Sequence, residues 1–258
     1  AARVVGLDVA GVDLVAQDIG RPLQAQGGAV VEVNAGPGLL MHLKPATGLS
    51  RPVGRAIVDH LFDEGGNGRV PIVGVAGSRH GHAISRLVAW LLHLSGRHVG
   101  LACRDGLFLG NRQIDARPSA HWAAGQRLLM NREVDAVVLE NGAAAILDDG
   151  LAYDRCAVGV VTDLDDFQGL EHHDVRDVEQ LYRVLRTQVD VVLPDGVAVL
   201  NGDDARVAQM AALCDGDVIF YGLDGTAPLL EAHRTAGKRT VSVSDGALVL
   251  AEGVRKVH

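Results

Sequence analysis

The 258-residue sequence is 48% hydrophobic and 22% charged, which is enough apolar material for a large folded core and is not typical of a disordered chain. A formal net charge of −8 without a basic run argues against nucleic acid or an anionic membrane as a partner. No apolar run approaches the roughly 20 residues of a membrane helix and no signal-peptide pattern opens the chain, so we expect a cytoplasmic protein.

The first part of the chain predicts few elements. Residues 1–5 have a helical pattern but no N-cap residue before it, as if the helix began further upstream. We therefore expect this sequence to be a piece of a longer protein. Alternating apolar residues predict strands at 11–16 and 29–33, joined by a turn-rich segment at 20–28. A helical pattern follows at 53–62. Two strands and one helix are too little to form an independent domain.

A Gly-rich polar stretch at 63–69 predicts a boundary between a first domain, residues 1–64, and a second, residues 65–258. Strand and helix patterns then alternate. The predicted strands are 70–75, 99–102, 136–140, 157–162, 197–200, 218–221 and 240–243, and the predicted helices are 83–94, 175–190 and 205–213. Such alternation, with only 3% aromatic residues, predicts an α/β fold whose mostly parallel sheet binds ligands beyond the carboxyl ends of its strands.

The first strand of the second domain runs into GVAGSRHGH, residues 74–82, and then into a helix. This is the position of a phosphate-binding loop, and we expect residues 77–82 to join a central parallel strand to that helix. Such a loop uses glycines for close backbone approach, a lysine for the terminal phosphates and a hydroxyl for magnesium; the lysine is missing here. The loop residues are Gly74, Gly77, Ser78, Arg79, His80, Gly81 and His82.

This loop resembles the GVTGTNGKT loop of Mur-type ligases in the form found in cyanophycin synthetases, whose lysine falls on Gly81 and whose threonine falls on His82. The resemblance extends over nearly the whole chain. EVNAGPG at 32–38 resembles the segment that closes an ATP-grasp domain, and LDVAGVD at 7–13 resembles the strand before it. The segments RDG (104–106), DRCAVGVVT (154–162) and VLNGDD (199–204) also match the cyanophycin synthetase pattern.

The resemblance implies the end of an ATP-grasp module followed by the P-loop-like central domain of a Mur ligase. The parent would be an ATP- and magnesium-dependent amide ligase acting on an amino acid or dipeptide, with the upstream ATP-grasp module in the same chain and a homo-oligomeric habit. By resemblance, Asp13, Glu32 and Asn34 would bind magnesium there. The sequence ends without a Mur-type C-terminal domain after His258, which resembles the shortened type that polymerises aspartyl-arginine dipeptide at its ATP-grasp site alone.

The Mur-like site has lost several family residues. The family's ETARGG reads ENGAAA at 140–145, which keeps Glu140 but replaces the arginine by Ala143. In the family's VTNIAADHLG segment, the Asp-His pair becomes Phe167 and Gln168. The metal-binding carbamylated lysine falls on Leu185.

Glu140, Asn201 and Asp204 are the residual Mur-like residues. Because phosphoryl transfer depends on positioning and charge neutralisation, these combined losses predict that no ATP or metal binds here and that the domain is kept for its fold. We assign no catalytic residue in it.

Three alternatives remain open. The domain could be a regulatory module that binds a nucleotide or an anion without turnover, and His80 and His82 could form a His-x-His zinc site. Asp165 and Asp166 could act as an acid-base pair, although a solvated loop is the plainer interpretation. The remaining conspicuous side chains are interpreted as packing or surface residues: His93, His98, His121, His172, His173, Cys103, Cys156 and Cys214.

Overall fold

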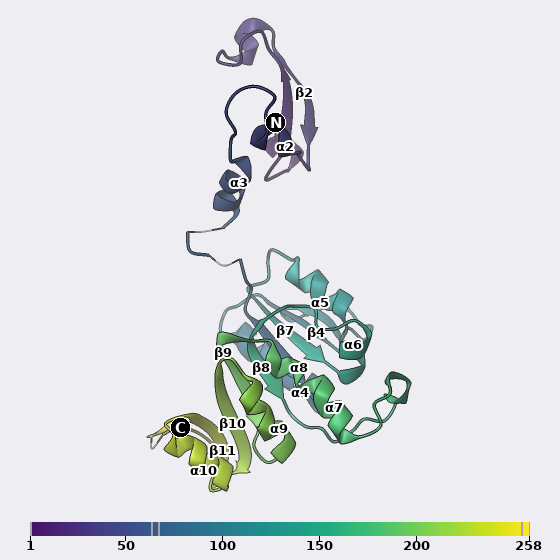
Figure 1. Ribbon diagram of the computed structural model, residues 1–258, viewed down its shortest axis with the longest axis vertical. Helices are drawn as coiled ribbons and strands as arrows, with labels where there is room; N and C mark the ends of the chain where they lie inside the picture. Colours follow the sequence, from purple (N-terminus) through teal and green to yellow (C-terminus); the bar gives the residue numbers. More distant parts are fainter. Residues whose placement is uncertain (1, 63, 67, 254, 258) are drawn as a thin grey trace. The chain divides into compact units, whose positions relative to one another are not determined.

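The computed structural model describes residues 2–62, 64–66, 68–253 and 255–257, with the side chains of 256 and 257 excepted (Figure 1). The chain divides into two compact units, Ala1–Arg69 and Val70–His258. The Gly-rich stretch therefore belongs to the first unit, and its Asp63 and Asn67 lie outside the described residues. None of the described helices has the length and apolar character needed to cross a bilayer.

The first unit is a two-stranded antiparallel sheet with short helices. Its elements are α1 Ala2–Val5, β1 Gly11–Val15, η1 Leu23–Gln26, β2 Ala29–Asn34, α2 Leu40–Leu43 and α3 Val53–Leu61. Among its described residues, no side chain is buried. A two-stranded sheet without a covered face has little hydrophobic stabilisation of its own.

The second unit is built on one large mixed sheet, with strand order β13-β12-β11-β10-β9-β8-β3-β7-β4-β5-β6 among the described residues. In chain order the strands are β3 Ile72–Ala76, β4 Val99–Cys103, β5 Gly106–Leu109, β6 Arg112–Asp115, β7 Ala136–Asn141, β8 Cys156–Val161, β9 Val192–Asn201, β10 Asp217–Asp224, β11 Arg239–Ser244, β12 Ala247–Glu252 and β13 Arg255–Val257. The strands from β4 to β11 in this order pair in parallel, and an antiparallel hairpin extends each edge. The predicted α/β fold with a mostly parallel sheet is confirmed.

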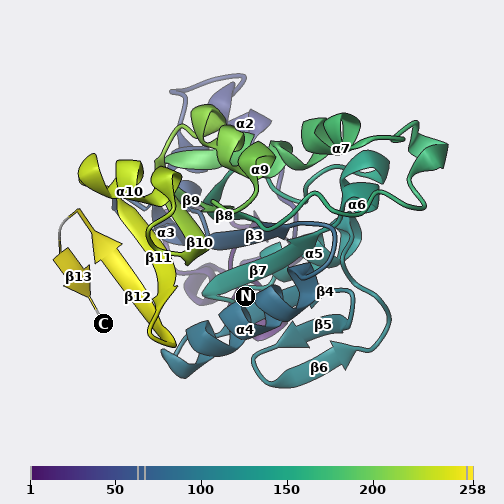
Figure 2. The same ribbon diagram turned by 90° about the horizontal axis from the view of Figure 1, so that it is seen from below.

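Helices cover both faces of this sheet (Figure 2). They are α4 Gly81–Leu94, α5 Trp122–Leu129, α6 Ala143–Asp148, η2 Glu171–His173, α7 Val178–Leu185, α8 Thr187–Asp190, α9 Ala205–Gln209, η3 Met210–Leu213 and α10 Pro228–Thr235. The α4 face forms a small core in which Val75, Val138 and Val160 pack with Ala89. The other face, with α5 and α7 to α10, forms the larger core. Side chains alternate between the two cores along each strand, as the period of a strand requires.

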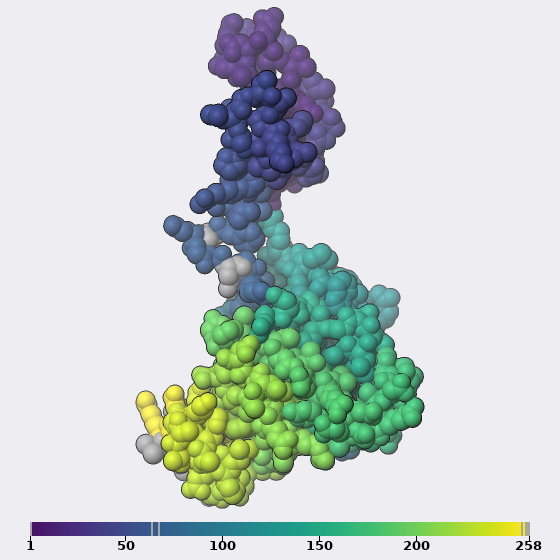
Figure 3. Space-filling model, in the orientation of Figure 1, coloured from purple at the N-terminus to yellow at the C-terminus, as the bar shows by residue number. Residues whose placement is uncertain are grey.

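Strand β3 lies in the middle of the sheet, hydrogen-bonded in parallel to β7 on one side and to β8 on the other. The prediction that residues 77–82 follow a central parallel strand is confirmed. In the space-filling view, the yellow segment near the end of the chain lies at one end of the second unit, away from the teal segment that contains α5 and α6 (Figure 3). The yellow segment holds β12 and β13, which form one edge of the sheet.

Two predicted helices are shorter than expected. The helix predicted at 175–190 begins only at Val178, because Asp177 is extended and its Oδ1 caps the helix by accepting from the Gln180 backbone N–H at 2.8 Å. It is also interrupted between α7 and α8. The α-helix predicted at 205–213 ends at Gln209 and continues as 3₁₀ turns to Leu213.

A closed polar network lies buried beneath β3. The Asn141 amide donates to Tyr153 Oη at 2.8 Å and to Gln188 Oε1 at 2.7 Å, and Tyr153 Oη donates to the same Gln188 oxygen at 2.9 Å. A side chain at Gly74 would overlap Tyr153 Oη and place its Cβ 2.5 Å from the Gln188 amide. Burial raises the pKa of Tyr153 far above its usual value, so the phenol stays a donor. The network therefore requires glycine at position 74.

We expect Gly74→Ala to lower the free energy of unfolding of the second unit by about 1–3 kcal/mol, because an added methyl must displace a fully hydrogen-bonded buried network. Gly142→Ala is the matched control, since its Cβ would meet nothing within 4 Å. Urea unfolding followed by circular dichroism measures both variants. Equal stabilities for the two would contradict the role given to Gly74.

Candidate functional site

The loop between β3 and α4 is held at the carboxyl ends of β3, β7 and β8. His80 is the N-cap residue of α4, and its side chain makes no capping hydrogen bond. The loop therefore has the setting that the sequence predicted, a parallel strand that leads through glycine into a helix N-terminus. In that setting, free backbone N–H groups attract anions.

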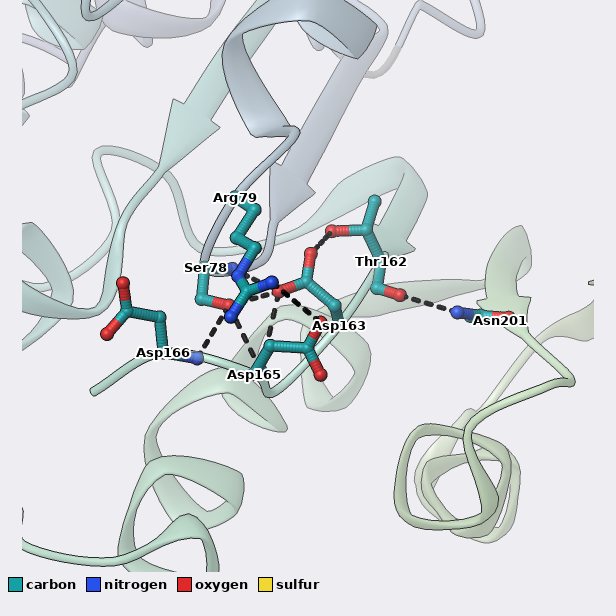
Figure 4. Close-up of polar contacts among 7 residues, drawn as sticks. All are labelled: Ser78, Arg79, Thr162, Asp163, Asp165, Asp166 and Asn201. Carbon is teal, nitrogen blue, oxygen red and sulfur yellow. Dashed lines mark hydrogen bonds and ion pairs between the residues drawn. The ribbon is translucent and has the colours of Figure 1, made fainter. Parts of the chain in front are cut away.

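Within the loop, Ser78 donates to a carboxylate of the protein itself (Figure 4). The Ser78 backbone N–H donates to Asp163 Oδ1 at 3.1 Å, and the Ser78 hydroxyl donates to the same oxygen. Thr162 Oγ1 donates to Asp163 Oδ2 at 2.7 Å. The Asp163 side chain, in the segment after β8, is buried. An internal carboxylate thus accepts both donors of Ser78, one residue of the loop that would face a bound phosphate.

Ser78 also forms hydrogen bonds with the segment after β8. Its Oγ accepts hydrogen bonds from the backbone N–H groups of Asp165, at 3.1 Å, and Asp166, at 3.0 Å. The Asp165 carboxylate lies 3.8 Å from Arg79, and Asp166 Oδ1 accepts from the Gln168 backbone N–H at 3.0 Å. The two aspartates therefore contribute chiefly backbone donors and local turn contacts, rather than a facing pair of carboxyl groups.

Glycine at position 77 lets the loop approach the segment after β8. Gly77 has φ +156°, and a Cβ there would overlap Thr162 Oγ1 and lie 3.1 Å from Asp163 Oδ2. Asn201, at the end of β9, donates from Nδ2 to the Thr162 carbonyl at 2.9 Å. Thr162 is thereby held between the loop and β9.

Electrostatics at this end of the sheet are unfavourable to a further anion. Burial raises the pKa of Asp163, but donors from Ser78, from Thr162 and from the Asp165 backbone lower it by more, so its net pKa lies below the usual value and it is ionised at neutral pH. Burial, together with the charges of Asp163, Asp203 and Asp204, raises the pKa of Tyr221 to about 12. The lowered pKa of Asp163 means that the protein itself stabilises this negative charge.

Glu140, the retained family glutamate at the end of β7, is already paired. Its Oε2 accepts from the Arg104 backbone N–H at 2.7 Å, and its Oε1 lies 3.3 Å from Arg104 Nε. A Cβ at Gly81, where the family has its lysine, would lie 3.4 Å from Glu140 Cγ. The space for the missing lysine therefore begins next to Glu140. Sequence reasoning did not predict the Arg104 pairing, although Arg104 lies in a segment that matches the family.

The remaining residual and replaced positions have structural roles. Asp204 is the N-cap of α9 and accepts from the backbone N–H groups of Arg206 and Val207. Leu185, at the position of the family's metal-binding lysine, is fully buried in the larger core, and Phe167 packs against that core. Apolar packing therefore occupies positions where the family places charge.

In the first unit, the three predicted magnesium ligands share one face of the β1–β2 hairpin. Asp13 is directly opposite Glu32 in the antiparallel register, and Gly11 is opposite Asn34. Residues two apart on a strand lie on the same face, so Asn34 is beside Glu32. Two carboxylates directly opposite each other are destabilising unless a cation lies between them. This oxygen-rich pair fits a magnesium ion.

Neither the loop histidines nor the cysteines join a cluster of three potential metal ligands among the described residues. Among the described residues, no group of three potential ligands includes His80 or His82. Burial raises the pKa of Cys103 and raises that of Cys156 to about 12, so both are protonated thiols. All three cysteines are free.

No protein-family model matches the sequence. The cyanophycin synthetase of Geminocystis herdmanii is 35% identical over 253 residues, which are 98% of this chain and 29% of that protein. The cyanophycin synthetase of Nostoc sp. is 33% identical over 252 residues, 97% of this chain and 28% of that protein. The chain thus spans less than a third of the length of these relatives. A solved UDP-N-acetylmuramoyl-L-alanyl-D-glutamate–2,6-diaminopimelate ligase is similar in fold, with a TM-score of 0.54 at 15% identity, over 73% of this chain and 39% of that one.

Proposed function

Because this chain is homologous over 98% of its length to one segment of the cyanophycin synthetases, we propose that it is part of an ATP-dependent amide ligase. In this proposal its first unit completes an ATP-grasp site, and its second unit is a Mur-like domain that no longer uses ATP. The observation that carries the proposal is Asp163, whose ionised carboxylate accepts both Ser78 donors in the loop.

The magnesium of the parent ATP-grasp site would be held by Asp13, Glu32 and Asn34. Their common face on the β1–β2 hairpin supports this role. ATP and magnesium would supply the activation of a substrate carboxylate for amide formation. The carboxylates of this chain would hold the metal, while the upstream module would supply the nucleotide contacts. The substrate class is an amino acid or a dipeptide.

The second unit does not fit ATP at its loop. There is no lysine at position 81 and no hydroxyl at position 82, and the Asp163 carboxylate accepts both donors of Ser78 in the loop. A triphosphate would have to displace Asp163 or lie beside its charge. The alternative of a nucleotide- or anion-binding regulatory module has less support for the same reason. A structural role, bracing the ATP-grasp module, is the function we propose for this unit.

Mutations in the full-length parent protein test the proposed roles of the two units separately. Glu32→Gln should abolish ATP-dependent amide formation, since it removes a metal-ligand charge opposite Asp13. His82→Ala, in the Mur-like loop, should leave the rate unchanged. Phosphate release coupled to amide formation measures both. Loss of activity in His82→Ala, with Glu32→Gln still active, would reverse the assignment.

We also expect the protein to form a homo-oligomer, most simply a dimer. The expectation rests on the high aliphatic content of the chain and on the resemblance to an oligomeric family. Sedimentation velocity at micromolar concentration should give a species of at least twice the 27.1 kDa chain mass. A single monomeric boundary over this range would contradict it.

A further inference from the structure

Away from the loop, three side chains with metal-binding chemistry meet beside the end of α6. Asp148 is the last residue of α6, and His172 and His173 belong to the 3₁₀ turn η2. One potential ligand atom from each lies within 4.8 Å of the others. Sequence spacing alone does not connect them, since Asp148 precedes the histidines by more than twenty residues. The fold brings them together because α6 packs against α7, which follows η2.

The geometry is close to that of a zinc site. Zinc bonds of about 2.0–2.1 Å in a tetrahedral arrangement place two ligand atoms roughly 3.3–3.4 Å apart. His173 Nε2 lies 3.1 Å from Asp148 Oδ1, and the two imidazole rings lie side by side with centroids 3.9 Å apart. All three ligand atoms lie within 4.8 Å of one another, so the wider pairs would have to move closer to hold one zinc ion. Two imidazoles and one carboxylate are a ligand set that suits zinc.

The His173 ring carries a second indication. Its Nε2 is buried and has no hydrogen-bond partner among the described residues, although Asp148 Oδ1 is near. A buried polar atom without a hydrogen bond costs free energy, and a metal bond would satisfy it. The competing explanation is a simple ion pair between a protonated His173 and Asp148, which needs no metal and leaves His172 without a role.

We propose that Asp148, His172 and His173 form a binding site for a divalent transition metal, of which zinc is the probe of choice. With three protein ligands, one tetrahedral position stays open to water. Zinc bound here would connect the end of α6 to η2. The segment after β8, which includes Asp163, leads directly into η2. Metal binding would therefore restrain the segment that closes the phosphate loop.

The test is zinc titration of the whole chain in competition with a chromogenic chelator. Wild type should bind one zinc per chain. Asp148→Asn and His173→Ala should each weaken zinc binding at least tenfold, because each removes one of three ligands. Asp148→Asn preserves side-chain volume, so it tests the site even if His173→Ala is poorly folded. Zinc should also slow amide hydrogen exchange in η2 of the wild type and not in Asp148→Asn.

Two control variants test whether zinc binds to other side chains instead. His98→Ala removes an exposed histidine elsewhere, and Cys214→Ser removes the one cysteine that is not fully buried; both should bind zinc like wild type. No stoichiometric binding by the wild type, or equal affinity in wild type and Asp148→Asn, would overturn the proposal and leave the ion pair as the explanation. Loss of binding in Cys214→Ser alone would also overturn it.

Discussion

The triple variant Gly81→Lys, His82→Thr, Asp163→Asn is expected to bind ATP with magnesium at least tenfold more tightly than the unchanged chain. The lysine restores a charge-assisted hydrogen bond to phosphate, worth on the order of 1.5–3 kcal/mol, or roughly tenfold to a hundredfold in affinity. Threonine restores a hydroxyl for magnesium. Asparagine keeps an acceptor for Ser78 while removing the fixed negative charge. Calorimetry with ATP and magnesium at neutral pH measures the change.

A Cβ at the buried Gly81 would lie 3.4 Å from Glu140 Cγ, so the backbone accepts a side chain there and the lysine would start next to that carboxylate. Gly142→Lys is the matched control, because a lysine at that open position adds the same charge outside the loop. The double variant Gly81→Lys, His82→Thr, which keeps Asp163, should gain less affinity for ATP than the triple variant. If Gly142→Lys gained as much affinity as the triple variant, the loop would not be the site of the effect.

Gly77→Ala is expected to lower the free energy of unfolding of the second unit by about 2–6 kcal/mol. The added Cβ overlaps Thr162 Oγ1, and φ +156° is a backbone conformation that residues with side chains rarely adopt. Overpacking costs about 1–3 kcal/mol, and a strained backbone adds about 1–3 kcal/mol. Relief of the overlap would also move Thr162 away from Asp163, with loss of a 2.7 Å hydrogen bond.

Urea unfolding measures this effect against Gly142→Ala, whose Cβ has open space. The slope of the unfolding free energy with urea should stay the same in both variants, so that the midpoint reports stability. A Gly77→Ala midpoint within error of the control would mean that the loop can move away from the segment after β8 at little cost.

The central strand, loop and helix could be predicted from sequence because each has a strong local signal. An apolar run ends in glycines at 74 and 77, and a helical pattern follows. The β5–β6 hairpin at one edge was missed because its strands are short: each has four residues, and three of those in β6 are exposed. The helix start at Val178 depends on the cap made by Asp177, a local signal that the apolar pattern outweighed.

For the site, the register of the resemblance located the losses at Gly81, His82 and Leu185. It did not predict that Asp163 would accept the Ser78 donors. That contact joins residues 85 apart in sequence and exists only because β8 is the neighbour of β3. The replacement of asparagine by aspartate in the family's VTN segment was a visible signal, but its consequence depends on this strand order.

The most direct test of the account is calorimetric titration of the unchanged chain with ATP and magnesium at neutral pH. The account predicts no binding in the low micromolar range, because the loop lacks its lysine and Asp163 accepts the Ser78 donors. A low-micromolar dissociation constant that disappears when Gly77 or His82 is changed would contradict it and would make the second unit a working nucleotide site.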